Sequence, residues 1–274
     1  MKKLFFACLL LSTGSLVAQV RMPAPSPTQT IKQDFALGTI ELTYSRPIAK
    51  GRKIIGDLVP FNKVWRTGAN AATIIKFTDV VEIGGKRIDT GRYSLYTVPN
   101  ADTWEIILNK NTGNWGSNGY SETDDVVRVK VPVMKNKNYV ESFTMQFDAV
   151  KPESCELNLV WEKTAVKLPI KALVKDRIRA QIDKAMTAEK KPYWLAAQFY
   201  NEYENNPAKA LENIKLAVKD NPKAFYMWLY KAKLEKELGD KTAAMQSSKT
   251  SLELATAEKN DDYIKMNLDL QKKL

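Results

Sequence analysis

The stretch VVEIGGKRIDTGRYSLYTV, residues 80–98, decides the fold. Apolar and polar residues alternate on both sides of Gly84-Gly85, as they do in half-buried strands. Glycine adopts positive φ without steric cost, and two such residues in a row form the tight turn of a β-hairpin. Because a two-residue turn sends the chain straight back, the flanking strands must pair antiparallel. The stretch therefore predicts an antiparallel sheet.

Similar runs extend in both directions from this hairpin. In GTIELTYS, residues 38–45, the side chains of Ile40, Leu42 and Tyr44 fall on one face. The other runs are TIIKF (73–77), WEIILN (104–109), DVVRVKV (125–131), ESFTMQFDAV (141–150), CELNLVW (155–161) and VKLPIK (166–171). We expect about nine or ten short strands between residues 31 and 171, with no helix among them. This pattern predicts an antiparallel β-sandwich, in a jelly-roll-like variant, and places a solvated hairpin tip at residues 135–138.

Near residue 172 the period becomes helical. Val174, Ile178, Ile182 and Met186 are spaced by four residues, which puts them on one face of a helix. An internal repeat follows at an offset of 34 residues; it matches Trp194-Leu195 with Trp228-Leu229, Ala210 with Ala244, and Ala217 with Ser251. This period resembles the tetratricopeptide repeat, although Gln198 stands where that repeat expects a small residue. Residues 172–274 are thus predicted to form an α-helical, tetratricopeptide-like domain with helices near 174–189 and 261–274 as its caps.

The N-terminus has the features of a secretory signal peptide. Lys2 and Lys3 precede an apolar run, and we expect cleavage after Ala18, which lowers the formal net charge from +11 to +9. An uncleaved anchor and a lipoprotein carrying its lipid on Cys8 are the alternatives. Residues 19–30 form a Pro/Ser-rich linker. The mature protein is expected in the periplasm or secreted, with no transmembrane segment.

The composition argues against several classes of function. The chain has no histidine, the commonest general base and transition-metal ligand. Only Cys155 follows the signal peptide, so no intramolecular disulfide forms, and we expect it to be a buried small side chain. No Gly-rich dinucleotide motif follows an early strand, and we expect no cofactor. The excess of basic residues is spread over the chain, which disfavours a nucleic-acid partner.

Ordered motifs between residues 45 and 129 resemble a known family. They are SRP...GR.I.G.LVPF..VWRTGAN, then G.YSLYTVP, W.II.NK, WG...Y and DV.RV. This part is similar to domain-of-unknown-function family number 2911, a group of exported bacterial proteins, over roughly residues 30–165. Some members also carry a helical repeat tail. Because the family is uncharacterised, the resemblance implies little about activity.

The same motifs supply the candidate site residues. The candidates for ligand binding are Arg46, Arg52, Trp65, Arg66, Asn70, Tyr96, Asn109, Trp115, Tyr120 and Arg128. Arginine forks bind carboxylate or phosphate, and aromatic faces stack on rings, so these residue types point to a small anionic or carbohydrate ligand. The alternative is structural: Trp104 and Trp161 belong to the core, and the arginines pair with acids. We expect at least two of Arg46, Arg52 and Arg66 to line one concave site beside Trp65 or Trp115.

Two classes of function remain open. The favoured one is a non-enzymatic binding or scaffolding protein, in which the sandwich holds the ligand and the helical tail a protein or peptide partner. The alternative is a histidine-independent hydrolase or other enzyme that uses arginine with carboxylates such as Asp57, Glu105, Asp124 and Asp125. Asp124 and Asp125, with loop carbonyls, also offer the oxygen ligands of a calcium site. We assign no catalytic and no metal-binding residue.

Overall fold

The computed structural model describes residues 22–274, which form two compact units. The β unit runs to Asp34 and takes in Thr39–Thr78 and Ile83–Ile170. The helical unit comprises Phe35–Gly38, Asp79–Glu82 and Lys171–Leu274. The predicted signal peptide, residues 1–18, lies outside the described residues.

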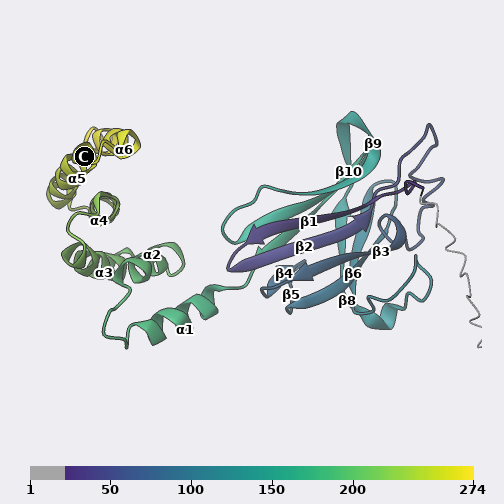
Figure 1. The fold of residues 1–274 in the computed structure, drawn as a ribbon, viewed down its shortest axis with the longest axis horizontal. Helices are drawn as coiled ribbons and strands as arrows, with labels where there is room; N and C mark the ends of the chain where they lie inside the picture. Colours follow the sequence, from purple (N-terminus) through teal and green to yellow (C-terminus); the bar gives the residue numbers. More distant parts are fainter. Residues whose placement is uncertain (1–21) are drawn as a thin grey trace, which may run out of the picture. The chain divides into compact units, whose positions relative to one another are not determined.

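Ten strands form two antiparallel sheets, as the alternation predicted (Figure 1). The strands are β1 Thr28–Phe35, β2 Gly38–Ser45, β3 Ala69–Phe77, β4 Val81–Ile83, β5 Lys86–Ile88, β6 Gly91–Val98, β7 Thr103–Asn109, β8 Asp125–Pro132, β9 Met134–Asp148 and β10 Ser154–Ala172. One sheet has the order β1-β2-β3-β6-β7-β8, and the other the order β5-β4-β10-β9. A single 3₁₀ turn, Glu122–Asp124, interrupts the described strands. The sandwich-like fold class is confirmed.

The glycine pair forms the hairpin turn that the sequence predicts. Gly84 and Gly85 have φ of 59° and 76°, and they join β4 to β5. Gly84 is also close to β8, because a Cβ placed there would come within 2.5 Å of Val129 Cγ2. Glycine at this position therefore serves both the turn and the approach of the hairpin to the other sheet.

The two sheets enclose an aromatic core. Trp65 lies 5.8 Å from Trp161 in a stacked arrangement, and it meets Trp104 and Phe143 edge-on at 6.1 and 5.0 Å. All four side chains are buried, so the expected core positions of Trp104 and Trp161 are confirmed. Cys155 is buried as well, and desolvation raises the pKa of its thiol to about 11.

The β9–β10 pair is less regular than the sequence suggested. Residues 135–138 belong to β9, so the expected hairpin tip there was wrong. The register shifts on either side of Glu162, which has a φ of 51°. Such shifts bend and twist a strand pair locally. At the other end of the unit, β1 begins at Thr28, inside the predicted linker.

The helical unit contains six helices within the described chain. They are α1 Lys175–Ala185, α2 Tyr193–Glu202, α3 Pro207–Asp220, α4 Phe225–Glu237, α5 Lys241–Ala257 and α6 Asp261–Gln271. α2 packs on α3 and α4 on α5, and the small residues of the repeat, Ala210, Ala244 and Ser251, are fully buried. Trp194 and Trp228 are only half-buried. No helix among residues 22–274 is both long and apolar enough to cross a membrane.

Candidate functional site

The loop between β7 and β8 presents the most exposed indole of the β unit. Trp115 is 70% exposed, although the loop around it is well anchored. The Asn114 amide donates to the Tyr96 hydroxyl (3.1 Å), the Ser117 hydroxyl donates to the Val64 carbonyl (3.2 Å), and Trp115 forms a β-bridge with Ala71. The indole is therefore held in solvent by a fixed backbone.

Arg66 lies directly beside this loop. A Cβ placed on Gly116 would be 3.6 Å from Arg66 Nη1, so the guanidinium packs against the residue that follows Trp115. The Nε of Arg66 is buried, and it has no hydrogen-bond partner in the described chain. No carboxylate among residues 22–274 forms an ion pair with Arg66. A buried donor without an acceptor is uncommon in native proteins and calls for an explanation.

Arg128 has the opposite surroundings. Its Nη1 donates to Glu105 (2.6 Å), and its Nη2 donates to Asp125 (3.0 Å), Glu122 (3.2 Å) and the Tyr120 hydroxyl (2.8 Å). Burial alone would lower the pKa of Arg128, but the hydrogen bonds to Glu105 and Asp125 outweigh it and raise that pKa. Burial, together with the hydrogen bond to Asp125, raises the pKa of Tyr120 well above its usual value. This arginine is neutralised by the protein itself.

Tyr96 and Asn109 hold the loop between β7 and β8 in place through buried contacts. Both are fully buried, and the Tyr96 ring meets Tyr120 edge-on at 5.0 Å. The Asn109 amide donates to the Ser121 carbonyl and to Asp125 (both 2.9 Å) and accepts from the Asn111 N–H (3.0 Å). These two predicted site residues hold the loop in place and do not face solvent.

The remaining candidates lie elsewhere. Arg46 donates to the Phe143 carbonyl and the Thr144 hydroxyl on β9 (3.1 and 2.8 Å), and Arg52 donates to the carbonyls of Ala49 and Ile48 (2.9 and 2.8 Å). Asn70 donates to Ser26 and Ser45, and Trp65 is in the core. None of the described hydrogen bonds joins Arg46 or Arg52 to Arg66. The structure therefore places Arg66 against the backbone of the Trp115 loop at Gly116, and it brings Asn109, Tyr120 and Arg128 together around Asp125. A shared cavity for the three arginines stays a prediction.

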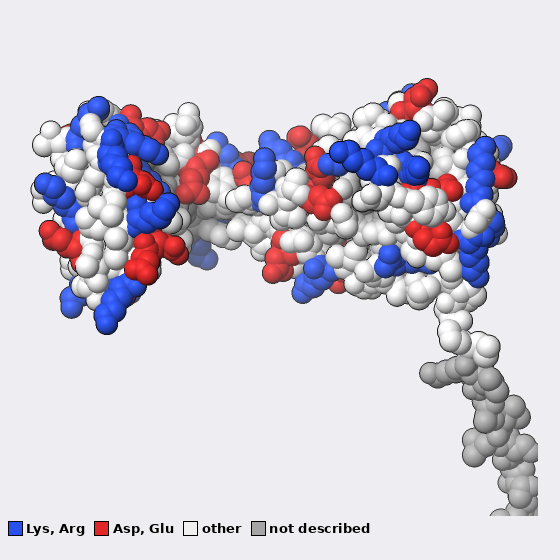
Figure 2. All heavy atoms as spheres, turned by 90° about the horizontal axis from the view of Figure 1, so that it is seen from above, with Lys and Arg blue, Asp and Glu red and all other residues white. Residues whose placement is uncertain are grey.

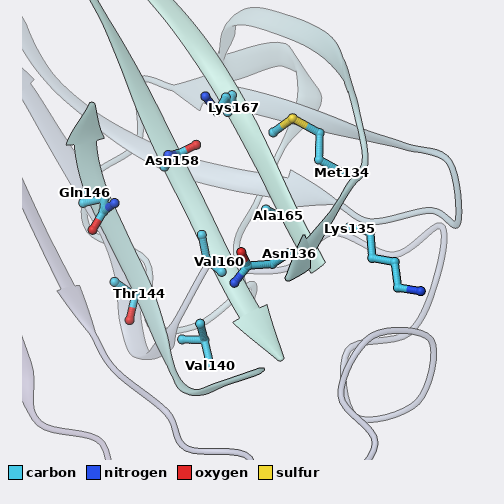
Figure 3. A pocket seen from close by; sticks show the side chains of 10 residues that line it. All are labelled: Met134, Lys135, Asn136, Val140, Thr144, Gln146, Asn158, Val160, Ala165 and Lys167. Atoms are coloured by element: carbon cyan, nitrogen blue, oxygen red, sulfur yellow. The ribbon is translucent and has the colours of Figure 1, made fainter. Parts of the chain in front are cut away.

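Sequence reasoning missed a pocket on the outer face of β9–β10 (Figure 3). Its cavity volume is about 500 Å³, and its lining is Met134, Lys135, Asn136, Val140, Thr144, Gln146, Asn158, Val160, Ala165 and Lys167. The alternation in CELNLVW did signal that Asn158 and Val160 face away from the core. Nothing in the sequence showed that the strand pair curves there.

Comparison with known proteins decides the family. The model of a family described as "Protein of unknown function (DUF2911)" matches residues 26–170, more than half of the chain. The chain belongs to the DUF2911 family. No curated protein and no solved structure matches the chain.

The DUF2911 region contains both features described above. The Trp115 loop with Arg66 and the β9–β10 pocket lie within residues 26–170, and α1–α6 lie beyond them. Within residues 22–274, no group of three or more His, Cys, Asp or Glu side chains is arranged to hold a metal ion. On the face seen in Figure 2, basic and acidic side chains are interspersed over each unit.

Proposed function

We propose that this protein is an exported binding protein whose DUF2911 region binds a small anionic ligand that carries a ring, such as a sugar acid. The observation that carries the proposal is that Arg66, whose buried Nε lacks a partner among the described residues, packs against Gly116, the residue after the 70% exposed Trp115. We name Arg66, Trp115 and Gly116 the Trp115 surface.

The chemistry of the two side chains is complementary. An exposed indole on an anchored loop offers a flat face on which a ring stacks without ordering a flexible backbone. A guanidinium offers donors in a fixed fork that fits a carboxylate or phosphate. Because no carboxylate of the described chain neutralises Arg66, a bound anion would supply its missing counter-charge.

The surroundings favour binding over hydrolysis. Glu105, Glu122 and Asp125 all form ion pairs with Arg128, so these carboxylates are already occupied by a protein partner. The raised pKa of Tyr120 keeps its hydroxyl protonated at neutral pH, and the chain has no histidine to act as a base. A histidine-independent hydrolase remains the alternative, and it would need a carboxylate outside this group.

The helical unit supports a second part of the proposal, the capture of a protein or peptide partner. Leu195 and Tyr226 are 58% and 38% exposed, and Trp194 and Trp228 are half-buried beside them on α2 and α4. Exposed apolar side chains on paired helices are typical of repeat domains that bind peptides. Export rests on the charged and apolar start of the sequence, with cleavage after Ala18.

Calorimetric titration of the mature protein, residues 19–274, with glucuronate tests the Trp115 surface. Trp115→Ala and Arg66→Lys should each weaken binding about tenfold or more, because each removes one of the two recognition elements. Titration with galactose separates the contribution of the ring from that of the charge.

Two matched controls make the result specific. Tyr139→Ala removes another exposed aromatic side chain, and Arg87→Lys changes an exposed arginine that already pairs with Asp89. Both controls should bind glucuronate as the wild type does. Undiminished binding by Trp115→Ala, or no binding of glucuronate by the wild type, would contradict the proposal.

A further inference from the structure

The outer face of β9–β10 forms one continuous pocket because of its irregular register. Before Glu162 the lining residues of β10 are Asn158 and Val160, and after it they are Ala165 and Lys167. The register shifts around Glu162 therefore change which side chains face outward, from even to odd positions. On β9, Gln146 lies opposite Asn158 and Thr144 opposite Val160. A curved face with side chains from both strands results.

Asp148 fixes the orientation of two amides at one end of this pocket. The Gln146 amide nitrogen donates to both Asp148 oxygens (3.2 and 3.1 Å), and the Asn158 amide nitrogen donates to Asp148 Oδ2. With their nitrogens held by the carboxylate, both amides have their carbonyl oxygens left as acceptors. Asn158 is only 9% exposed, and its Oδ1 has no hydrogen-bond partner within the described chain.

The charges around the pocket balance one another. Lys167 Nζ lies 2.7 Å from Glu156 Oε2, and this hydrogen bond raises the pKa of the lysine. Lys135 extends away from the other lining side chains in Figure 3. Asp148 supplies a second negative charge beside the amides. The pocket thus offers little net charge to a ligand, unlike Arg66 on the Trp115 surface.

An apolar strip completes the lining. Val140, Val160, Ala165 and Met134 contribute aliphatic side chains, and Figure 3 shows Asn136 directed toward Val160. Apolar groups beside a few fixed polar groups are typical of small-molecule sites. A molecule that presents hydroxyl groups on its edge and C–H groups on its face matches this combination.

We propose that the β9–β10 pocket binds a neutral, hydroxyl-rich ligand of the saccharide class. A ligand hydroxyl donates to Asn158 Oδ1, a second one pairs with Gln146, and the C–H face of the ring packs on Val160 and Ala165. The site is independent of the Trp115 surface, because its lining and its charge differ.

Titration of the mature protein, residues 19–274, with maltose, cellobiose and lactose, followed by amide chemical shifts, tests this pocket. At least one of the three should shift amide signals of β9 and β10 with saturation at millimolar concentration. Val160→Phe fills the cavity and should weaken binding at least about tenfold. Val150→Phe is the matched control, because Val150 is an exposed residue in the turn that joins the same strands, and it should leave binding unchanged.

A second variant protects the test against misfolding. Gln146 is exposed, so Gln146→Leu should fold normally and still weaken binding several-fold by removing one acceptor. Two results would each overturn the proposal: no saturable shift with any of the disaccharides, or unchanged binding by both pocket variants.

Discussion

Arg66 and Arg128 belong to the same motif-rich part of the chain, yet they have opposite surroundings. Arg128 donates to three carboxylates and a tyrosine hydroxyl, with distances between 2.6 and 3.2 Å. Arg66 packs against Gly116, and its buried Nε has no acceptor in the described chain. The first arginine holds β7, β8 and the preceding loop together. The second has hydrogen-bonding capacity that residues 22–274 leave unused.

This difference separates structural from binding residues better than residue type does. A buried donor without a partner costs about 1–3 kcal/mol of desolvation, so the Arg66 guanidinium is poorly satisfied by the protein alone. A donor that already has an acceptor in the protein gains no new hydrogen bond from a ligand. Thus Tyr120 and Arg128 fit a structural network, whereas Arg66 and Trp115 fit a ligand surface.

The largest expected effect is a difference in the free energy of unfolding between the Trp65→Ala and Trp115→Ala variants. Trp65→Ala should lower the free energy of unfolding by about 3–5 kcal/mol, because it leaves a cavity among Trp104, Phe143 and Trp161. Trp115→Ala should change it by less than about 0.5 kcal/mol, because the indole is exposed. Urea unfolding followed by circular dichroism measures both values. A large loss of stability in Trp115→Ala would show that the loop needs the indole for folding.

The sequence predicted the strands but could not separate these tryptophans. Alternation reports local structure, and it located the sheets, the Gly84-Gly85 turn and the change of period near residue 172. Trp65 and Trp115 both lie in segments rich in glycine and asparagine, so the local pattern is the same for both. Their burial depends on partners far along the chain, since Trp161 lies about 100 residues beyond Trp65 and Phe143 about 80 residues beyond it.

The β9–β10 pocket was out of reach for a related reason. Its shape depends on the register shifts around Glu162. No glycine or proline stands next to Glu162 to indicate them. The polar sequence KNKN at residues 135–138 is typical of a turn, but it extends β9 because it pairs with β10 near Thr164. Long-range pairing thus overrides local propensity there.

A smaller difference in the free energy of unfolding is expected between variants of Arg128 and Arg66. Arg128→Met leaves Glu105, Glu122 and Asp125 close together without a cation, so it should lower the free energy of unfolding by about 2 kcal/mol at neutral pH, discounted for partial exposure. Arg66→Met should cost less than about 0.5 kcal/mol, because no described partner is lost. Urea unfolding of the two variants in parallel makes the measurement. Equal losses would mean that Arg66 has an essential structural partner, and the comparison would fail.

The smallest effect tests the Arg128 network through the pH dependence of Tyr120. Burial and the hydrogen bond to Asp125 raise the pKa of Tyr120 in the folded protein above its usual value near 10. The folded state therefore retains a proton that the unfolded state loses, so this stabilising contribution is complete below pH 10 and is lost as the pH rises through the folded-state pKa. Between pH 9 and pH 11 the wild type should lose at most about 1 kcal/mol more than Tyr120→Phe, since solvent screens a partly exposed group. Urea unfolding at both pH values measures this difference, and the other tyrosines cancel because both proteins contain them. A wild type and a variant with the same pH dependence would show that Tyr120 titrates as a free phenol, outside the network that distinguishes Arg128 from Arg66.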